Sequence, residues 1–227
     1  MNSSRKYLLL IYLFLGGLVA GWLVLGFVAS PADFVSLFSM SSESSESSEK
    51  NTYASSERMR LKAFEEFKNG NASFGVGNLN KAMHHYREAL SLQPLFPEAH
   101  YMIGTVLGKM GRHEDAVAAS EKAVKLRPQY TEAYFQAGVF SQNLNNYGKA
   151  VSFFKKAIEA DEGFAPSYSA LARTYVDMKE LGPALEAISK AALIQIRRGN
   201  LVEARKALEI LAEIEEDGDE NRENYLR

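Results

Sequence analysis

The order of hydrophobic and polar positions divides the chain into three stretches. Residues 7–29 form one uninterrupted apolar run, residues 30–56 are rich in serine and glutamate, and residues 57–216 mix apolar and polar positions with helical spacing. In the third stretch, small residues also recur every 34 positions. The pattern predicts an all-α protein with a membrane-spanning helix, a flexible spacer and an array of repeated helical pairs.

The apolar run has the length of a membrane-spanning helix. Residues 7–29 read YLLLIYLFLGGLVAGWLVLGFVA and contain no charged residue. As a helix this run would span about 34 Å, enough to cross a hydrocarbon core of roughly 30 Å. We therefore expect a single transmembrane helix in the lipid bilayer. A cleaved signal peptide, with the small-residue site Ser30-Pro31-Ala32, is the alternative, although the run exceeds the usual length of about 7–15 residues.

The charged flanks give this expected helix an orientation. Arg5 and Lys6 precede it, and the next basic residue is Lys50. The positive-inside rule then places residues 1–6 in the cytoplasm and the remaining chain on the far side, the periplasm in the case of a bacterial inner membrane. Gly17 and Gly21 would let a second membrane helix pack closely, although glycine is in any case frequent in membrane helices.

Two polar segments flank the repeat region. Residues 30–56 include the run SSESSESSEK, whose apolar surface is too small to offset the entropy lost on ordering. We expect a disordered tether there. Residues 217–227 are acidic and are expected to form a solvated tail, with an interaction tail as the alternative.

Four copies of the repeated unit occupy residues 63–96, 97–130, 131–164 and 165–198. The eighth, twentieth and twenty-seventh positions of every copy are Gly or Ala. These positions hold Gly70, Gly104, Gly138, Ala172, Ala82, Ala116, Ala150, Ala184, Ala89, Ala123, Ala157 and Ala191. Because Gly and Ala make up only about one residue in six on average, the agreement is not chance.

This spacing has a mechanical cause, because two antiparallel helices approach closely only where the side chains are small. We expect positions eight and twenty to face each other within a hairpin and position twenty-seven to face the next hairpin. Turn residues at Gly77-Asn78, Gly111-Arg112 and Asn145-Asn146 indicate where the first helix of each pair ends. Pro94 and Pro128 end the second helix, since proline lacks the amide donor.

The pattern resembles the tetratricopeptide repeat (TPR) family, most closely in the second copy, at Gly104, Gly111, Ala116, Ala123 and Pro128. The resemblance implies the fold class. We expect an all-α chain in which a single N-terminal transmembrane helix is followed by a TPR α-solenoid of about four helical hairpins and a C-terminal capping helix. The TPR domain would cover residues 57–216.

The array is expected to end in a cap. Gly199-Asn200 and Ala204 restart the turn and second-helix pattern, so residues 184–198 would serve a second time as a first helix. Residues 201–216 would then cap the stack. Glu203, Arg205, Lys206 and Glu209 would point toward water, because a solenoid needs a polar outer face at its ends.

The resemblance also implies a concave groove, lined by the first helices, that holds a peptide or helix of another protein. Its expected lining residues are Phe67, Asn71, Phe74, Tyr101, Met102, Thr105, Phe135, Gln136, Val139 and Arg173. One variant of the family binds acidic chaperone C-termini through a clamp of Lys, Asn and Arg. Only Asn71 matches that clamp here, because Phe67 and Gln136 stand where the clamp has Lys and Arg.

Composition and charge mainly exclude classes of function and chemistry. The formal net charge of -2 gives no argument for nucleic-acid binding. The chain has no cysteine, which excludes disulfides, thiolate metal sites and a cysteine nucleophile. His84 and His85 are adjacent and would point about 100° apart on a helix, so they do not form an i, i+4 metal pair. We expect no catalytic residue, metal or cofactor, and hence no enzyme.

These features together predict a membrane-anchored scaffold or adaptor for protein–protein interaction. It would assist the assembly, secretion or maintenance of a membrane or envelope complex. Two alternatives stay open: a permanent structural subunit of a larger membrane complex, and an organelle-surface receptor for targeting sequences.

Overall fold

The structure is a computed structural model that describes the backbone of residues 31–212 and the side chains of residues 53–212. Every regular element in this part of the chain is a helix. By internal contacts the chain divides into two compact units, one up to Glu57 and one from Arg58 onward. The repeats lie in the second unit.

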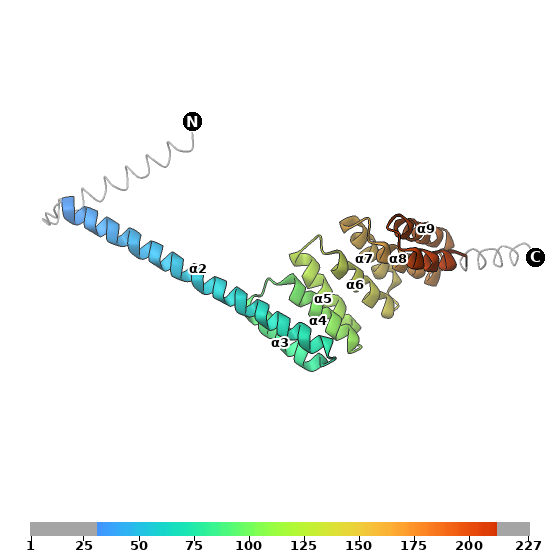
Figure 1. Ribbon diagram of the computed structural model, residues 1–227, viewed down its shortest axis with the longest axis horizontal. Helices are drawn as coiled ribbons and strands as arrows, with labels where there is room; N and C mark the ends of the chain where they lie inside the picture. The colour runs from blue at the N-terminus through green and yellow to red at the C-terminus, as the bar shows by residue number, and fades with distance from the viewer. Residues whose placement is uncertain (1–30, 213–227) are drawn as a thin grey trace, which may run out of the picture. The chain divides into compact units, whose positions relative to one another are not determined.

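The helices of the second unit form consecutive antiparallel pairs (Figure 1). The C-terminal part of α2 (Pro31–Gly75) pairs with α3 (Leu79–Leu92), and α4 (Pro97–Lys109) pairs with α5 (His113–Leu126). The next pairs are α6 (Thr131–Asn143) with α7 (Tyr147–Ala160), and α8 (Ala165–Asp177) with α9 (Leu181–Arg197). A further helix covers residues 201–212. The four copies predicted from the sequence correspond to these four hairpins.

Helix α2 is much longer than the expected first helix of the array. It begins at Pro31 and includes residues 31–56, for which the sequence analysis expects a disordered tether. Proline suits the start of a helix, and neither proline nor glycine interrupts residues 32–69. Extending a helix costs far less than nucleating one, and residues 63–75, packed in the first hairpin, supply the nucleus. Composition alone misses this propagation.

The expected membrane-spanning helix is absent from the architecture that the structure describes. Between residues 31 and 212, no helix combines the length and apolar character that crossing a bilayer requires. The longest described helix, α2, carries the serine and glutamate run. The fold class is therefore corrected to an all-α solenoid of repeated hairpins without a membrane-spanning helix in this part of the chain.

Several expectations fall on residues outside the described part of the chain. These are the apolar run 7–29 with Gly17 and Gly21, the N-terminal residues 1–6, the end of the cap at 213–216 and the acidic tail 217–227. The periplasmic placement rests on the flanks of that run and stays a prediction.

The turns within the hairpins share one geometry. The residue at position fifteen adopts a positive φ of 77° at Gly77, 75° at Gly111, 56° at Asn145 and 61° at Lys179. Gly and Asn adopt this conformation readily, whereas a lysine is strained in it. The three turns predicted from the sequence are confirmed. The fourth turn was not predicted, because Lys179 does not have the residue type that this conformation favours.

The periodic small residues form the centre of the hairpins. The alanines at positions twenty and twenty-seven have no solvent exposure in any of the four copies, and the residues at position eight are all buried. The prediction that these twelve positions are contact points between helices is confirmed.

The expected partner of position eight was position twenty, but the side chain that position eight meets within its hairpin is at position twenty-four. A β-carbon on Gly70 would overlap the ring of Tyr86, and one on Gly138 would overlap the ring of Phe154. The fourth hairpin instead has Ala172 at position eight, and its position twenty-four holds the smaller, fully buried Ile188. The size of the residue at position eight thus limits the size of the residue at position twenty-four.

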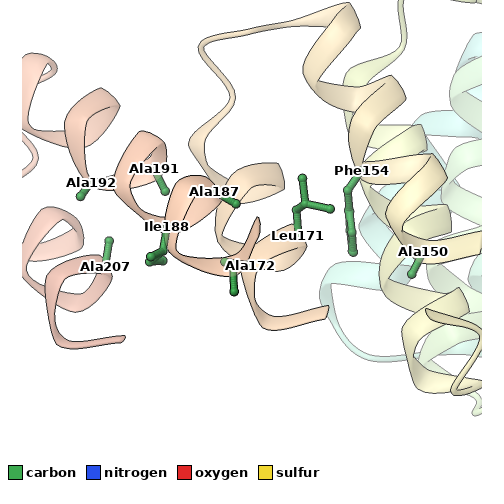
Figure 2. Close-up of a cluster of buried hydrophobic side chains, with 10 residues drawn as sticks. Ala150, Phe154, Leu171, Ala172, Ala187, Ile188, Ala191, Ala192 and Ala207 are labelled. Atoms are coloured by element: carbon green, nitrogen blue, oxygen red, sulfur yellow. The ribbon is translucent and has the colours of Figure 1, made fainter. Parts of the chain in front are cut away.

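The last two hairpins share one continuous core cluster (Figure 2). Figure 2 shows Leu171 of α8 lying beside the ring of Phe154 of α7. The same cluster continues through Ala172 and Ile188 to Ala207 in the helix of residues 201–212. Neighbouring hairpins are therefore held together by apolar contacts that run from one to the next.

We predict opposite effects for two glycine-to-alanine substitutions in the third hairpin. Gly138→Ala should lower the free energy of unfolding by about 1–3 kcal/mol, because its methyl group overpacks against Phe154. Gly148→Ala, in α7, meets no atom within 4 Å and should raise it by about 0.5–1 kcal/mol, because alanine favours the helix. Urea denaturation measures both. Equal changes in the two variants would refute the close contact at position eight.

Candidate functional site

The first helices of the hairpins line the inner side of the array. Helix α4 contacts α6, and α6 contacts α8. Among the described residues, no pair of second helices makes comparable contact. The array therefore curves toward its first helices, as the resemblance implies. The candidate site lies on this side, and we call its surface the inner face. It consists of the side chains at positions nine, twelve and thirteen of the first helices, where two of the twelve residues are glycine: Asn71, Phe74, Thr105, Lys109, Val139, Gln142, Asn143, Arg173, Val176 and Asp177.

Three of the expected groove residues, all at position five, join one hairpin to the next. The ring of Phe67 lies 5.0 Å from that of Phe96, the ring of Tyr101 lies 5.2 Å from that of Tyr130, and Phe135 lies 5.5 Å from Phe164. Phe96, Tyr130 and Phe164 all stand at position thirty-four, directly before the next first helix. Aromatic pairs at these distances stabilise by about 0.5–1.5 kcal/mol beyond their area.

The sequence analysis did not identify the aromatic residues at position thirty-four. Their signal was present, because Phe96, Tyr130 and Phe164 recur with the same 34-residue period as the small residues. The period ends at Arg198, and position five of the fourth copy is Ser169. The ladder of ring pairs thus joins the first three hairpins to their successors and stops there.

Gln136, another expected groove residue, is buried between the second and third hairpins. Its Nε2 donates to Thr105 Oγ1 at 2.6 Å, and its Oε1 accepts from Ser120 Oγ at 2.7 Å. Ser120 occupies position twenty-four, where the first and third hairpins have a ring. The amide therefore fills space beside Gly104, whose β-carbon would lie 2.8 Å from Gln136 Oε1. Gln136 and Thr105 satisfy each other and are not available to a ligand.

The remaining expected residues lie on or beside the inner face. Asn71 is exposed, and its Oδ1 accepts a hydrogen bond from Tyr86 Oη at 2.8 Å. Phe74 is half-buried beneath the Lys109 ammonium, which lies 5.5 Å from the ring centroid. Met102 and Val139 are half-buried against the core, and Arg173 is exposed. These five side chains leave part of their surface to solvent.

Polar groups cross the inner face between neighbouring first helices. Gln142 Nε2 on α6 donates to Asp177 Oδ2 on α8 at 3.2 Å. Asn143, next to Gln142, is exposed, and its side-chain amide can both donate and accept hydrogen bonds. Cations at Lys109 and Arg173 and the anion at Asp177 alternate with half-buried apolar side chains. The inner face is therefore of mixed character, without a single dominant charge.

Three tyrosines packed within the array stay neutral at pH 7. Burial raises the pKa of Tyr86 to about 12. Burial also raises the pKa of Tyr101, with a further contribution from Glu132, and it raises the pKa of Tyr130. The phenol groups therefore act as hydrogen-bonding and packing groups and add no charge to the inner face.

The histidines do not gather into a site. His85 Nδ1 lies 2.7 Å from Glu66 Oε2 and links α3 to α2. Burial lowers the pKa of His100, which is therefore neutral at pH 7. In residues 53–212, no cluster of three or more His, Asp or Glu side chains has the arrangement to hold a metal ion.

Family models identify the repeats directly. Residues 70–111 match the model described as TPR repeat, and residues 97–130 and 131–164 each match the model described as Tetratricopeptide repeat. The two matches of the Tetratricopeptide repeat model have the same bounds as the second and third copies predicted from the sequence. The chain therefore contains tetratricopeptide repeats, and these matches indicate no catalytic family. They do not show membrane anchoring.

Solved structures with the same fold include several TPR proteins. MamA from Desulfovibrio magneticus RS-1 is 22% identical, with a TM-score of 0.54 over 70% of this chain and 97% of that chain. YrrB, described as a TPR protein with an unusual peptide-binding site, is 29% identical, with a TM-score of 0.54 over 63% of this chain and 74% of that chain. The TPR2B domain of yeast Sti1, in complex with pHsp70, is 22% identical, with a TM-score of 0.51 over 53% of this chain and 97% of that chain. No curated protein matches the chain significantly.

We predict that the position-five aromatics contribute to stability. Phe135→Ala should lower the free energy of unfolding by about 2 kcal/mol, less than the 3–5 kcal/mol of a fully buried ring, because Phe135 is half-buried. Phe64→Ala is the matched control, since Phe64 also lies on a first helix but is 55% exposed. Its loss should cost under about 0.5 kcal/mol. Thermal and urea denaturation compare the two, and equal stability of both variants would show that Phe135 is not a junction residue.

Proposed function

We propose that this protein is a protein–protein interaction scaffold that holds a segment of another protein along its inner face. One observation carries the proposal. The aromatic side chains at position five are held in ring pairs and the small residues at position eight are buried, whereas the side chains at nine, twelve and thirteen, apart from Thr105, make no such junction and stay wholly or partly exposed. The fold thus separates a structural row from a row that is available for contact.

The chemistry of the inner face indicates the kind of segment that fits. Asn71 and Asn143 offer amide donors and acceptors of the type that pair with the backbone of an extended chain. Half-buried Phe74, Met102 and Val139 between them offer apolar contact for alternate side chains. An extended segment with alternating apolar side chains therefore fits better than a highly charged one.

An acidic chaperone C-terminus does not fit this face. A carboxylate clamp needs cationic side chains at positions five and six, and here Phe67 packs against Phe96 while Gln136 is buried. Of the two exposed cations of the inner face, Lys109 lies over the Phe74 ring, and Arg173 stands at position nine of α8, where Gln142 already donates to the neighbouring Asp177. One Arg and one Lys on different helices, without a clamp residue at position five or at Gln136, give weak selection for a carboxylate.

The role that follows is that of an adaptor assisting the assembly or maintenance of a larger complex. The fold is shared with the TPR2B domain of Sti1, whose structure is a complex with pHsp70, and with YrrB, which is described as having an unusual peptide-binding site. A permanent subunit is the alternative role. Stoichiometric co-purification with one complex would favour the subunit, and substoichiometric association with several clients would favour the adaptor.

Site-specific photo-crosslinking tests the proposal. A benzophenone amino acid at Asn143 or at Arg173, both exposed on the inner face, should crosslink the same partner protein in cells of the source organism. The matched control places the label at Ser152, which is exposed on the second helix α7. Mass spectrometry identifies the adducts.

Adducts to one protein from both inner-face positions, and not from Ser152, are the expected result. A second variant links the adducts to the face itself. Asn143→Arg, combined with the label at Arg173, should reduce the adduct at least about tenfold while leaving the melting temperature unchanged, because Asn143 is exposed. Equal labelling from Ser152, or no adduct from either inner-face position, would refute the proposal.

A further inference from the structure

The ring of Tyr86 on α3 lies across the backbone of α2 at Gly70. A β-carbon on Gly70 would lie 2.5 Å from Tyr86 Cε1 and 3.1 Å from Cζ, the ring carbon that carries the hydroxyl group. Because glycine has no side chain, the ring extends past position eight toward the neighbouring position nine. The hydroxyl group meets Asn71 there, and Tyr86 Oη donates to Asn71 Oδ1 at 2.8 Å.

The burial of Tyr86 fixes the direction of this hydrogen bond. The residue has no solvent exposure, and within residues 53–212 no group other than Asn71 Oδ1 bonds to its hydroxyl. Burial also raises the pKa of Tyr86 to about 12, so the hydroxyl keeps its hydrogen at neutral pH. If the Asn71 amide were turned around, that hydrogen would stay unpaired in the interior, which is costly for a buried donor. Asn71 therefore turns its carbonyl oxygen toward Tyr86.

This orientation decides which end of the Asn71 amide is free for a partner. An asparagine side chain has a carbonyl oxygen that accepts and an NH2 group that donates two hydrogen bonds. The carbonyl oxygen is engaged with Tyr86. Asn71 is exposed, and its Nδ2 makes no hydrogen bond within the side chains that the structure describes. At this point the inner face therefore presents free N–H donors.

The third hairpin contains the same arrangement without the hydroxyl group. The ring of Phe154 lies on the backbone at Gly138, just as the ring of the first hairpin lies on its glycine. Position nine, which a hydroxyl group would reach, holds the apolar Val139. A polar residue at position nine thus accompanies the hydroxyl group, and an apolar residue accompanies its absence. Since a ring alone satisfies the packing, the hydroxyl group of Tyr86 serves Asn71.

Free hydrogen-bond donors occur at the two ends of the row formed by position nine. In the second hairpin the Thr105 hydroxyl is used twice, because it accepts from Gln136 Nε2 and donates to the Tyr101 carbonyl at 3.1 Å. In the fourth hairpin Arg173 is exposed, and a guanidinium group carries donors only. The row therefore offers donors at Asn71 and Arg173, and no acceptor that is without an internal partner.

We propose that Tyr86 is a positioning residue that makes Asn71 a hydrogen-bond donor to a main-chain carbonyl of the bound segment. This inference rests on the proposed function and names the group that the first hairpin recognises. A carbonyl group accepts and does not donate, so it matches a site where the donors are free. Every residue of an extended segment has such a carbonyl. Asn71 therefore holds the chain itself, and neighbours such as half-buried Phe74 select the side chains.

Peptide binding to the full chain in mild detergent tests this role. The probes are fluorescent peptides selected from a random library on wild type and kept only if Asn143→Arg, on the inner face, weakens them. Asn71→Asp keeps an oxygen for the Tyr86 hydroxyl but removes both N–H donors, so the dissociation constant should rise about tenfold. Tyr86→Phe keeps the ring and leaves the amide free to turn, so the dissociation constant should rise about threefold.

Tyr147→Phe is the matched control for the loss of a tyrosine hydroxyl. Tyr147 Oη donates to Asn145 Oδ1 at 3.1 Å, outside the inner face, and its removal should leave the dissociation constant unchanged. The melting temperatures of Asn71→Asp and Tyr86→Phe should stay close to that of wild type. A loss of affinity without a loss of folding separates the positioning role from a role in packing.

Thioamide replacement of single main-chain carbonyls in the peptide identifies the acceptor, because sulfur accepts hydrogen bonds more weakly than oxygen. One replacement should weaken binding to wild type by about threefold and leave binding to Asn71→Asp unchanged, since that variant has already lost the donor.

Three results would overturn the inference. Selected peptides that do not respond to Tyr86→Phe or to Asn71→Asp would remove the positioning role and leave the proposed function standing. A response to Asn71→Asp without any thioamide-sensitive carbonyl would show that Asn71 meets a side chain of the segment instead. A selection that yields no peptide sensitive to Asn143→Arg would overturn the proposed function together with the inference.

Discussion

The close approach of the two helices of each hairpin at position eight is the constraint on which the array depends. Where position eight is glycine and position twenty-four is aromatic, a ring lies directly on the backbone, as at Gly138 and Phe154. Where both residues are small, as at Gly104 and Ser120, the Gln136 amide fills the space. Where position eight is Ala172, the opposing residue shrinks to Ile188. Because protein interiors are close-packed, each solution conserves the filled volume.

This constraint decides which residues are left for binding. Aromatic residues at position five are held by rings at position thirty-four, and Gln136 is held by the second hairpin's core. Apart from Thr105, which pairs with Gln136, the residues one turn further along the first helices do not take part in these contacts and stay exposed in part. The array can therefore change the inner-face residues without losing its packing, which is how one fold can bind different partners.

Much of the fold could be read from the sequence, because a strict period of small residues leaves few alternatives. The hairpins, three of the four turns and the contact role of twelve small positions followed from spacing alone. The site was less accessible. Family register placed Phe135 and Gln136 in the groove, but whether such a side chain faces a ligand or a neighbouring hairpin depends on partners at position thirty-four or twenty-four. Those partners become visible only when the helices are set side by side.

Two other expectations failed for different physical reasons. Composition predicted disorder for residues 31–56, but helix propagation from a packed nucleus extends α2 back to Pro31. The membrane-spanning element of the expected fold class rested on hydropathy alone, and no helix between residues 31 and 212 has that character. Local composition is informative about a segment by itself and less so about a segment attached to a folded neighbour.

A double-mutant cycle on Gly138 and Phe154 tests the central constraint most directly. The fourth hairpin pairs alanine with isoleucine, so Gly138→Ala combined with Phe154→Ile should rebuild that pair in the third hairpin. The double variant should be more stable, by about 1 kcal/mol or more, than the sum of the two single changes in unfolding free energy predicts. The reason is that the added methyl group occupies volume that the ring has vacated. Additive effects, within about 0.5 kcal/mol, would show that positions eight and twenty-four do not constrain each other.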